Sequence, residues 1–234
     1  MAEHDEPPAP ESDSEPTRAS APDHTGTKAT RYRRHNPGLE FDRVAFFSDA
    51  VFAIAMTLLV VGIGVPPGPA DALRDEIKDK QPEIVSFFIS FVVIGNYWLA
   101  HHRFFARLVS MSPRLMTINL VYLAAIAFAP FPTALAGKFT DQPISIILYA
   151  ITLSVASSLE AVMFVTANRA RLLDEVVPFA MERYMVVAAV IPVSLFLVSI
   201  PIAYVDTQLA LATWILIFPL EILADRLLKP ADET

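Results

Sequence analysis

Two otherwise apolar stretches of the sequence contain side chains that could form a hydrogen-bonded or proton-carrying group. RVAFFSDAVFAIAMTLLVVGIGVP carries Ser48 and Asp49, and NYWLAHHRFF carries Trp98, His101 and His102. An aspartate in an apolar helix is costly unless it is paired, and indole and imidazole N–H groups are suitable partners. Histidine also titrates near neutral pH. Two uses stay open for this group: contact between helices, and gating or pH sensing.

These groups can meet only if both stretches are neighbouring, antiparallel helices. Asp49 lies about two turns from the start of the first helix, and the histidine doublet lies in the last two turns of the second. The two positions then have the same depth in the membrane. We expect Ser48 and Asp49 to bond to the Trp98 indole and to one of the histidines, with the choice between His101 and His102 open.

The first stretch also has a second, apolar face. At about 100° per residue, Ile54, Leu58 and Val61 form one stripe, which extends forward to Val65. Thr57 lies on its flank, and Asp49 comes out on nearly the opposite face. A row of Ile, Leu and Val is typical of a lipid-facing or packing surface, and it would line a pore only if an oligomer placed it on a symmetry axis.

The elements that position these faces are membrane-spanning helices. Only 18% of the 234 residues are charged and 54% are hydrophobic, which is typical of a polytopic membrane protein. Six apolar runs of about 20 residues predict an all-α protein with six transmembrane helices. The predicted spans are residues 41–65, 84–106, 116–136, 143–166, 183–204 and 208–225. The fifth and sixth are separated only by VDTQ, which predicts a tight helical hairpin.

The distribution of basic residues predicts the orientation. Thirteen Lys and Arg residues lie on the side of both termini, against four (Arg74, Lys78, Lys80 and Lys138) on the other. Basic residues favour the cytoplasmic side, so both termini are expected there. Residues 1–38, rich in Pro, Ser, Asp and Glu, are predicted to be a disordered cytoplasmic tail. Residues 39–229 would form the membrane domain and 230–234 a short cytoplasmic end.

Several classes of function have no support in the sequence. There is no P-loop, dinucleotide-binding, His-Glu-x-x-His or nucleophile-elbow motif, so we expect no enzymatic activity. The chain has no cysteine, which excludes disulfides and thiolate metal sites. No cofactor or metal other than a permeant ion is expected, and no nucleic acid partner.

Arg43, Phe47, Ser48 and Asp49 form an R-x-x-x-F-S-D pattern, followed by AVFAIAMTLLVVGIGVP and later by NYWLAHHRFF. With six spans, these residues resemble the prokaryotic branch of the lysosomal potassium channel family, whose signature is a Phe-Ser-Asp motif in the first helix. The resemblance covers about residues 40–228 and is most specific in the first two spans. It implies a homotetramer of six-span subunits without a re-entrant filter loop. The absence of a Thr-Val-Gly-Tyr-Gly stretch agrees with this.

The resemblance also assigns roles to residues. It implies that the first helices of four subunits line the pore, with an apolar constriction as the gate and a nearby threonine ring that aids selectivity. Transferred by position, the gate is Ile54, Leu58 and Val61, and the threonine is Thr57. The supporting network that it implies comprises Arg43, Phe47, Ser48, Asp49, Trp98 and one of His101 and His102.

The sequence therefore predicts a potassium-permeable cation channel with modest preference for K⁺ over Na⁺. Its expected partners are other copies of itself, the lipid bilayer and K⁺, and its expected location is the bacterial inner membrane. A proton-permeable pathway or proton-coupled transporter that uses Asp49 and the histidines stays open as the alternative. Transporters often contain inverted repeats, but the second half of the chain has no counterpart of the Phe-Ser-Asp cluster.

Overall fold

A computed structural model of the chain describes residues 37–66, 68–69, 71–175 and 177–228. The elements in this part are helices, with one isolated antiparallel bridge between Leu108 and Leu173. In chain order they are α1 (Pro37–Leu58), the 3₁₀ helix η1 (Leu59–Ile63), α2 (Leu73–Asp79), α3 (Gln81–Ala106), α4 (Pro113–Phe128), α5 (Pro130–Lys138), α6 (Pro143–Arg169), α7 (Phe179–Ala203), α8 (Thr207–Thr213), the 3₁₀ helix η2 (Trp214–Leu216) and α9 (Ile217–Leu228). The predicted all-α class is confirmed for this part of the chain.

The predicted tail and C-terminal end, residues 1–38 and 230–234, lie outside the described residues, except that α1 already includes residues 37 and 38. Six spans within the described part are long and apolar enough to cross a bilayer, as predicted. They are Phe41–Ile63, Gln81–Ala106, Pro113–Lys138, Pro143–Arg169, Phe179–Ala203 and Thr207–Leu227. The chain is therefore a multi-pass membrane protein.

Proline and capping side chains set several helix boundaries. Pro130 begins α5, because a proline lacks the backbone N–H that would continue α4 and its ring crowds the preceding turn. The Ser112 hydroxyl caps α4 by accepting from the Leu115 N–H at 3.2 Å. The Asp206 carboxylate caps α8 in the same way, accepting from the Leu209 N–H at 2.9 Å, which closes the predicted hairpin between α7 and α8.

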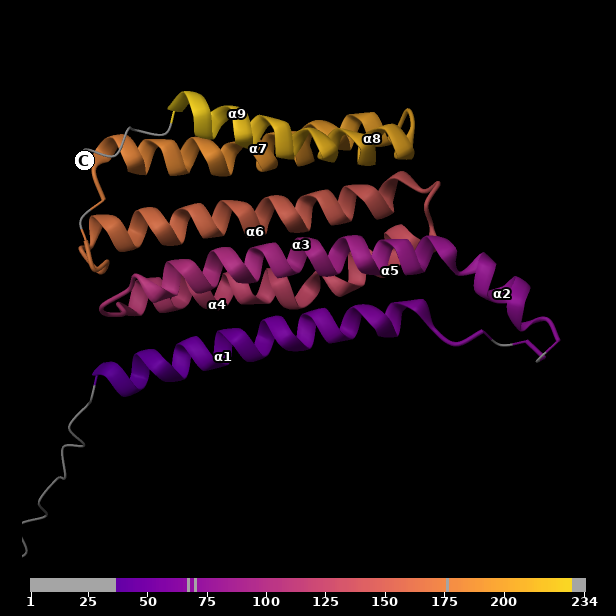
Figure 1. Cartoon of the computed structure of the whole chain (residues 1–234), viewed down its shortest axis with the longest axis horizontal. Helices are drawn as coiled ribbons and strands as arrows, with labels where there is room; N and C mark the ends of the chain where they lie inside the picture. The colour runs from indigo at the N-terminus through magenta and orange to yellow at the C-terminus, as the bar shows by residue number, and fades with distance from the viewer. Residues whose placement is uncertain (1–36, 67, 70, 176, 229–234) are drawn as a thin grey trace, which may run out of the picture. The chain divides into compact units, whose positions relative to one another are not determined.

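The helices pack around α6, which contacts α4, α5, α7 and α8. In the α6 span 56% of the most apolar window is buried within the chain, whereas in the span that contains α1 the share is 22%. Helix α1 lies at one edge of the bundle (Figure 1) and is held by α3 and α4. One side of α1 is therefore packed and the other is left open within a single chain.

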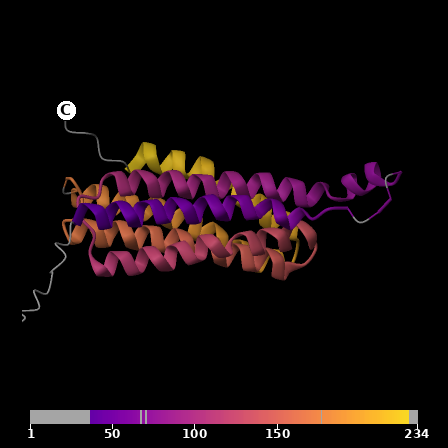
Figure 2. The same ribbon diagram turned by 90° about the horizontal axis from the view of Figure 1, so that it is seen from below.

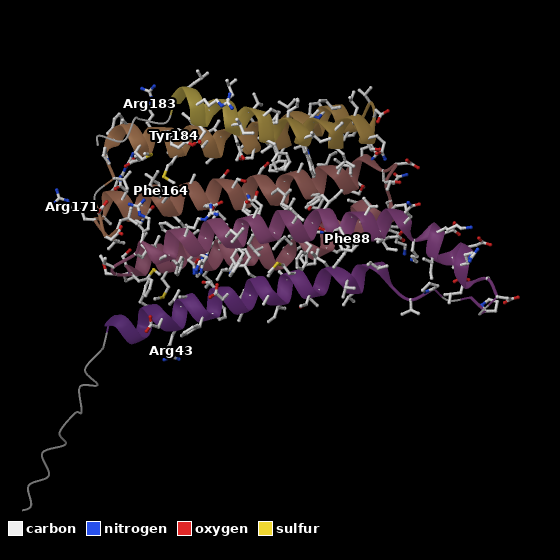
Figure 3. All side chains as sticks on the ribbon, viewed as in Figure 1. Arg43, Phe88, Phe164, Arg171, Arg183 and Tyr184 are labelled. Atoms are coloured by element: carbon white, nitrogen blue, oxygen red, sulfur yellow. The ribbon has the colours of Figure 1, made fainter. Side chains whose placement is uncertain are left out.

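Helix α1 begins and α9 ends at the same end of the bundle (Figures 1 and 2). The side chains of Arg43, Arg171 and Arg183 lie toward this end (Figure 3). The arrangement agrees with an even number of spans and with basic residues gathered on the side of both termini.

One close approach between helices requires a glycine. A Cβ added at Gly137 in α5 would lie 2.9 Å from the backbone Cα of Glu83 and 3.1 Å from the Cβ of Ser86, both in α3. The Ser86 hydroxyl also donates to the Thr133 carbonyl at 3.1 Å, so the two helices are bonded where they approach. The absence of a side chain at Gly137 is therefore what lets α5 and α3 pack here.

We expect Gly137→Ala to destabilise the fold. Overpacking costs about 1–3 kcal/mol, offset by about 1 kcal/mol of better helix propensity, for a net loss of about 1 kcal/mol. The measurement is the midpoint of thermal unfolding of the protein in detergent. The matched control is Gly95→Ala in α3, where an added Cβ meets nothing within 4 Å and the midpoint should stay or rise. Equal midpoints for the two variants would contradict the close contact.

Candidate functional site

Helix α1 presents one face to the rest of the chain. Ser48, Phe52, Ala55 and Leu59 are all buried, with Ser48 at 0% exposure, and they follow the i, i+4, i+7, i+11 spacing of a helical stripe. Ser48, Phe52 and Ala55 lie in α1, which packs against α3 and α4, and Leu59 begins η1, which packs against α3 and α5. This face fixes the rotation of α1 about its own axis, and hence which residues point away.

The opposite face of α1 and η1 carries the predicted gate residues, Ile54 and Leu58 in α1 and Val61 in η1. Ile54 is 57% exposed, Val61 is 70% exposed, and Leu58 is also exposed. Thr57 lies on the same open side, with its hydroxyl donating back to the Ile54 carbonyl at 2.9 Å. That bond supplies a partner for the hydroxyl hydrogen and leaves the oxygen as an acceptor on the open side.

The predicted stripe keeps Val61 on the open side, but its extension to Val65 is wrong. The α-helix ends at Leu58 and continues as the 3₁₀ helix η1, which has three residues per turn. Val61 is therefore rotated relative to its position on a continued α-helix. Val65 follows Gly64, whose φ of 65° ends the helix in a conformation that favours glycine, so Val65 is not part of the stripe.

The predicted bond between Asp49 and Trp98 is present. The Trp98 indole N–H on α3 donates to Asp49 Oδ1 at 2.9 Å. The His102 ring stacks on the indole, with ring centroids 5.5 Å apart. The Asp49 carboxylate, on the side of α1 that meets α3, thus accepts a hydrogen bond from Trp98, as a carboxylate within a membrane requires.

The second half of the predicted network runs through a residue on a third helix. Asn119 of α4 donates from Nδ2 to the Ser48 hydroxyl at 3.1 Å, and its Oδ1 lies 2.9 Å from His101 Nε2. Ser48 in turn donates to the Val44 carbonyl at 2.9 Å. Because the Asn119 oxygen can only accept, His101 carries its proton on Nε2 in this arrangement. Asn119 therefore joins the buried faces of α1 and α3.

His101 is part of this buried centre rather than a partner of Asp49. The side chain is 2% exposed, and its ring stacks on Phe105 and Tyr122 at centroid distances of 4.1 and 5.5 Å. The ring of Phe52 packs against it at a tilt, 5.4 Å away. The prediction that one histidine bonds directly to Asp49 is not met: His101 bonds to Asn119, and His102 stacks on the indole that holds Asp49.

In the part of the chain that the structure describes, Arg43 and Phe47 do not join the network. Arg43 is exposed and its side chain points away from the other helices (Figure 3), and Phe47 is also exposed. The predicted network thus divides into a pair of Asp49 and Trp98, a triad of Ser48, Asn119 and His101, and two residues on the open side of α1.

Sequence reasoning missed Asn119, although a signal was available. Asn119 is the only carboxamide in the stretch RLMTINLVYLAAIAF, and a buried amide in an apolar helix needs partners. It also missed a second buried group, in which the Thr133 hydroxyl donates to the Ser90 hydroxyl at 3.0 Å and Ser90 bonds the Tyr149 hydroxyl at 2.7 Å. This group ties α3 to α5 and α6.

A family model described as TMEM175, endosomal/lysosomal potassium channel TMEM175, matches residues 43–130. The matched segment contains both faces of α1, the Trp98 and His101 end of α3, and Asn119 of α4. Residues 43–130 are therefore similar to the TMEM175 family. The resemblance carried by the Phe-Ser-Asp motif and by NYWLAHHRFF is confirmed.

Individual relatives agree with the match to the TMEM175 family model. A potassium channel of Streptomyces collinus is 38% identical over 105 residues, which is 44% of this chain and 50% of the relative. The endosomal/lysosomal proton channel TMEM175 of Gallus gallus is 30% identical over 113 residues, which is 44% of this chain and 23% of the relative. The chain thus spans half or less of the length of these relatives. Both relatives are named as channels and not as enzymes, as the sequence analysis expects.

The fold matches that of a solved TMEM175 homolog. The crystal structure of a lysosomal potassium-selective channel TMEM175 homolog from Chamaesiphon minutus has a TM-score of 0.63 to this chain at 24% identity. The match covers 82% of this chain and 100% of that one. The six-span fold therefore extends beyond residues 43–130 to most of the membrane region.

Proposed function

We propose that this chain forms a potassium-permeable cation channel in which the open face of α1 lines the pore. The observation that carries the proposal is the row formed by Ile54, Leu58 and Val61, which is exposed on a helix whose other face is firmly packed. The helix lies in the segment that matches the TMEM175 family, and the bacterial relatives are named potassium channels. A closed ring of copies around α1 would turn this row into successive apolar rings.

In the proposed channel four copies surround the pore, and the apolar rings act as the gate. Such a ring can close a pore by filling it or by excluding water from a gap. Thr57, with its acceptor oxygen on the open side, supplies the polar ring that aids selection of K⁺. The permeant K⁺ is the only ion or cofactor required. The distribution of Lys and Arg supports an orientation with both termini in the cytoplasm, and the bacterial relatives support a location in the bacterial inner membrane.

The anchoring contacts have a separate role in this proposal. Trp98 holds Asp49, and Asn119 holds Ser48, on the side of α1 that faces away from the row. These bonds fix the rotation of α1, so that the same side chains point to the axis in every subunit. Arg43 and Phe47, on the open side, are left for contacts between subunits.

The test is ion flux through purified protein in liposomes. With equal outward gradients, K⁺ efflux should exceed Na⁺ efflux by a modest factor, because a hydroxyl ring discriminates less than a cage of carbonyls. Failure of the protein to pass any cation at any gradient or pH would overturn the proposal.

Thr57→Ala should lower the ratio of K⁺ to Na⁺ permeability by roughly threefold while flux itself continues, because the variant removes the polar ring and leaves the apolar ones. The ratio is obtained from the reversal potential in mixed K⁺ and Na⁺ solutions. Thr117→Ala is the matched control: Thr117 is also exposed and also bonds a backbone carbonyl, that of Pro113, but lies on α4. An unchanged ratio in Thr57→Ala would remove Thr57 from the selectivity role.

A proton pathway is the second candidate, since the animal relatives are named proton channels. It would use Asp49, which is half-buried beside Trp98 and His102. Asp49→Asn keeps an acceptor for the indole but cannot titrate. Loss of pH-driven proton flux with retained fold in this variant would favour the proton pathway, whereas retained K⁺ flux favours the proposed channel.

A further inference from the structure

A groove outside the pore-facing side of α1 combines two arginines with an apolar wall. It has a volume of about 540 Å³ and lies between α4, α6 and α7. Its lining includes Arg114 at the start of α4, Arg169 at the end of α6, and three valines, Val162, Val165 and Val186. The network around Ser48 and Asp49 contributes no residue to this lining, so the groove is a separate feature.

The arginines and the valines lie at different depths. Arg114 is the second residue of α4 and Arg169 the last of α6, so both lie at the end of the bundle where α1 begins. Val162 precedes Arg169 by seven residues, which is about 10 Å along a helix. In a bilayer spanned by these helices, the arginine end of the groove would face the lipid headgroups and the valines would face the first acyl carbons.

One of the two guanidinium groups is held in place. Arg169 donates from Nε to Glu182 Oε1 at 3.3 Å, and Asn168 Nδ2 donates to Glu182 Oε2 at 2.5 Å. Glu182 is buried while the Arg169 side chain is 73% exposed, so the carboxylate anchors the guanidinium from behind. Among the described residues this contact uses only Nε, which leaves the terminal Nη groups of Arg169 for an anion.

Glu182 offsets the charge of Arg169, so the net positive charge of the groove comes from Arg114. No described carboxylate lies within ion-pair distance of Arg114. The groove is also lined by Ser112, the cap of α4, where the helix dipole favours a negative group. An arginine pair with an adjacent helix start is complementary to a phosphate, and the valine wall is complementary to an acyl chain.

We propose that this groove binds one anionic phospholipid from the adjoining membrane leaflet. The phosphate contacts Arg114 and Arg169, and the start of an acyl chain lies on the three valines. The inference rests on the multi-pass membrane fold and not on the proposed channel, so either can fail without the other.

The test is native mass spectrometry of the intact protein released from detergent, titrated with phosphatidylglycerol or with phosphatidylcholine of the same acyl chains. Phosphatidylglycerol should bind about tenfold more tightly, because only its headgroup leaves the phosphate charge uncompensated. Arg114→Gln should weaken phosphatidylglycerol binding by about tenfold, the loss expected for one charge-assisted contact.

Two further variants separate the groove from general effects. Val162→Trp fills the apolar part without a change of charge and should also weaken binding of phosphatidylglycerol. Arg183→Gln removes an exposed arginine from the same end of the bundle but not from the lining, and binding should stay within about twofold of wild type. If Arg114→Gln does not fold, Val162→Trp carries the test.

Three results would overturn the proposal. The first is equal binding of the two lipids. The second is wild-type binding of phosphatidylglycerol in both Arg114→Gln and Val162→Trp. The third is stabilisation of the protein by inorganic phosphate alone, in a thermal unfolding assay, as large as that by phosphatidylglycerol at the same concentration, since this would identify the ligand as a free anion.

Discussion

Leu58→Asn is expected to raise K⁺ efflux from proteoliposomes by at least about tenfold, which corresponds to about 1.4 kcal/mol of barrier. Leu58 is exposed in the middle of the row on α1, between Ile54 and Val61. An amide of similar size at this ring would hold water where leucine excludes it. The measurement is the initial rate of efflux at matched protein density, from a quenched-fluorescence assay with a proton ionophore to balance charge.

The control places an asparagine at an exposed apolar position on another helix. Val190 of α7 is exposed to a similar degree, and Val190→Asn tests whether a polar residue on any exposed apolar surface makes liposomes leaky. Efflux should rise in Leu58→Asn and not in Val190→Asn. If both variants behave as wild type, the row on α1 faces lipid or packing surface and the proposed pore must be abandoned.

Asn119→Leu is expected to destabilise the bundle by about 2–3 kcal/mol. The substitution leaves the buried His101 Nε2–H without its acceptor and removes the donor to Ser48, and an unsatisfied buried polar group costs about 1–3 kcal/mol. The midpoint of thermal unfolding in detergent should fall by about 5 °C or more. Helix α1 should also become more mobile, which would appear as faster hydrogen exchange of its amides.

Two comparisons identify the cause of that loss. Asn96→Leu removes an exposed amide from α3, and its midpoint should not fall. The double variant His101→Phe/Asn119→Leu removes both partners and should recover part of the stability, because replacing a bonded pair by apolar groups can be nearly neutral. A double variant as unstable as the sum of its parts would show that the bond between His101 and Asn119 contributes little.

Helical periodicity was sufficient to predict the spans and the two faces of α1. Runs of apolar residues set the spans, and the 3.6-residue period placed Ile54 and Leu58 opposite Asp49, as the structure has them. The tighter winding of η1 shifts Val61 by about 60° from its α-helical position but leaves it exposed, and the prediction fails at Val65, beyond Gly64. Nothing in LVVGI itself distinguishes the two windings, since they differ by small changes in backbone angles.

Partners of buried polar groups were harder to predict, because they depend on which helices pack and at what register. A direct bond between Asp49 and a histidine was predicted because only the next helix along the chain was considered. In the structure, Asn119 of α4 bonds to His101 and to Ser48, and among the described residues Asp49 bonds to Trp98. The contacts of Arg43 could not be predicted from the next helix either, because Arg43 lies on the open side of α1 and points away from the other helices of the chain.

The 3₁₀ winding of η1 couples the length of this segment to the rotation of its side chains about the helix axis. Its five residues rise about 2.0 Å each, against 1.5 Å in an α-helix, so that rewinding them into α form would shorten the element by about 2.5 Å. The same change would turn Val61 by about 60° relative to Leu58. A small displacement along the helix axis of the segment that joins η1 to α2 would therefore rotate Val61. The winding of these five residues thus sets which side chain lies directly beyond Leu58 on the open side.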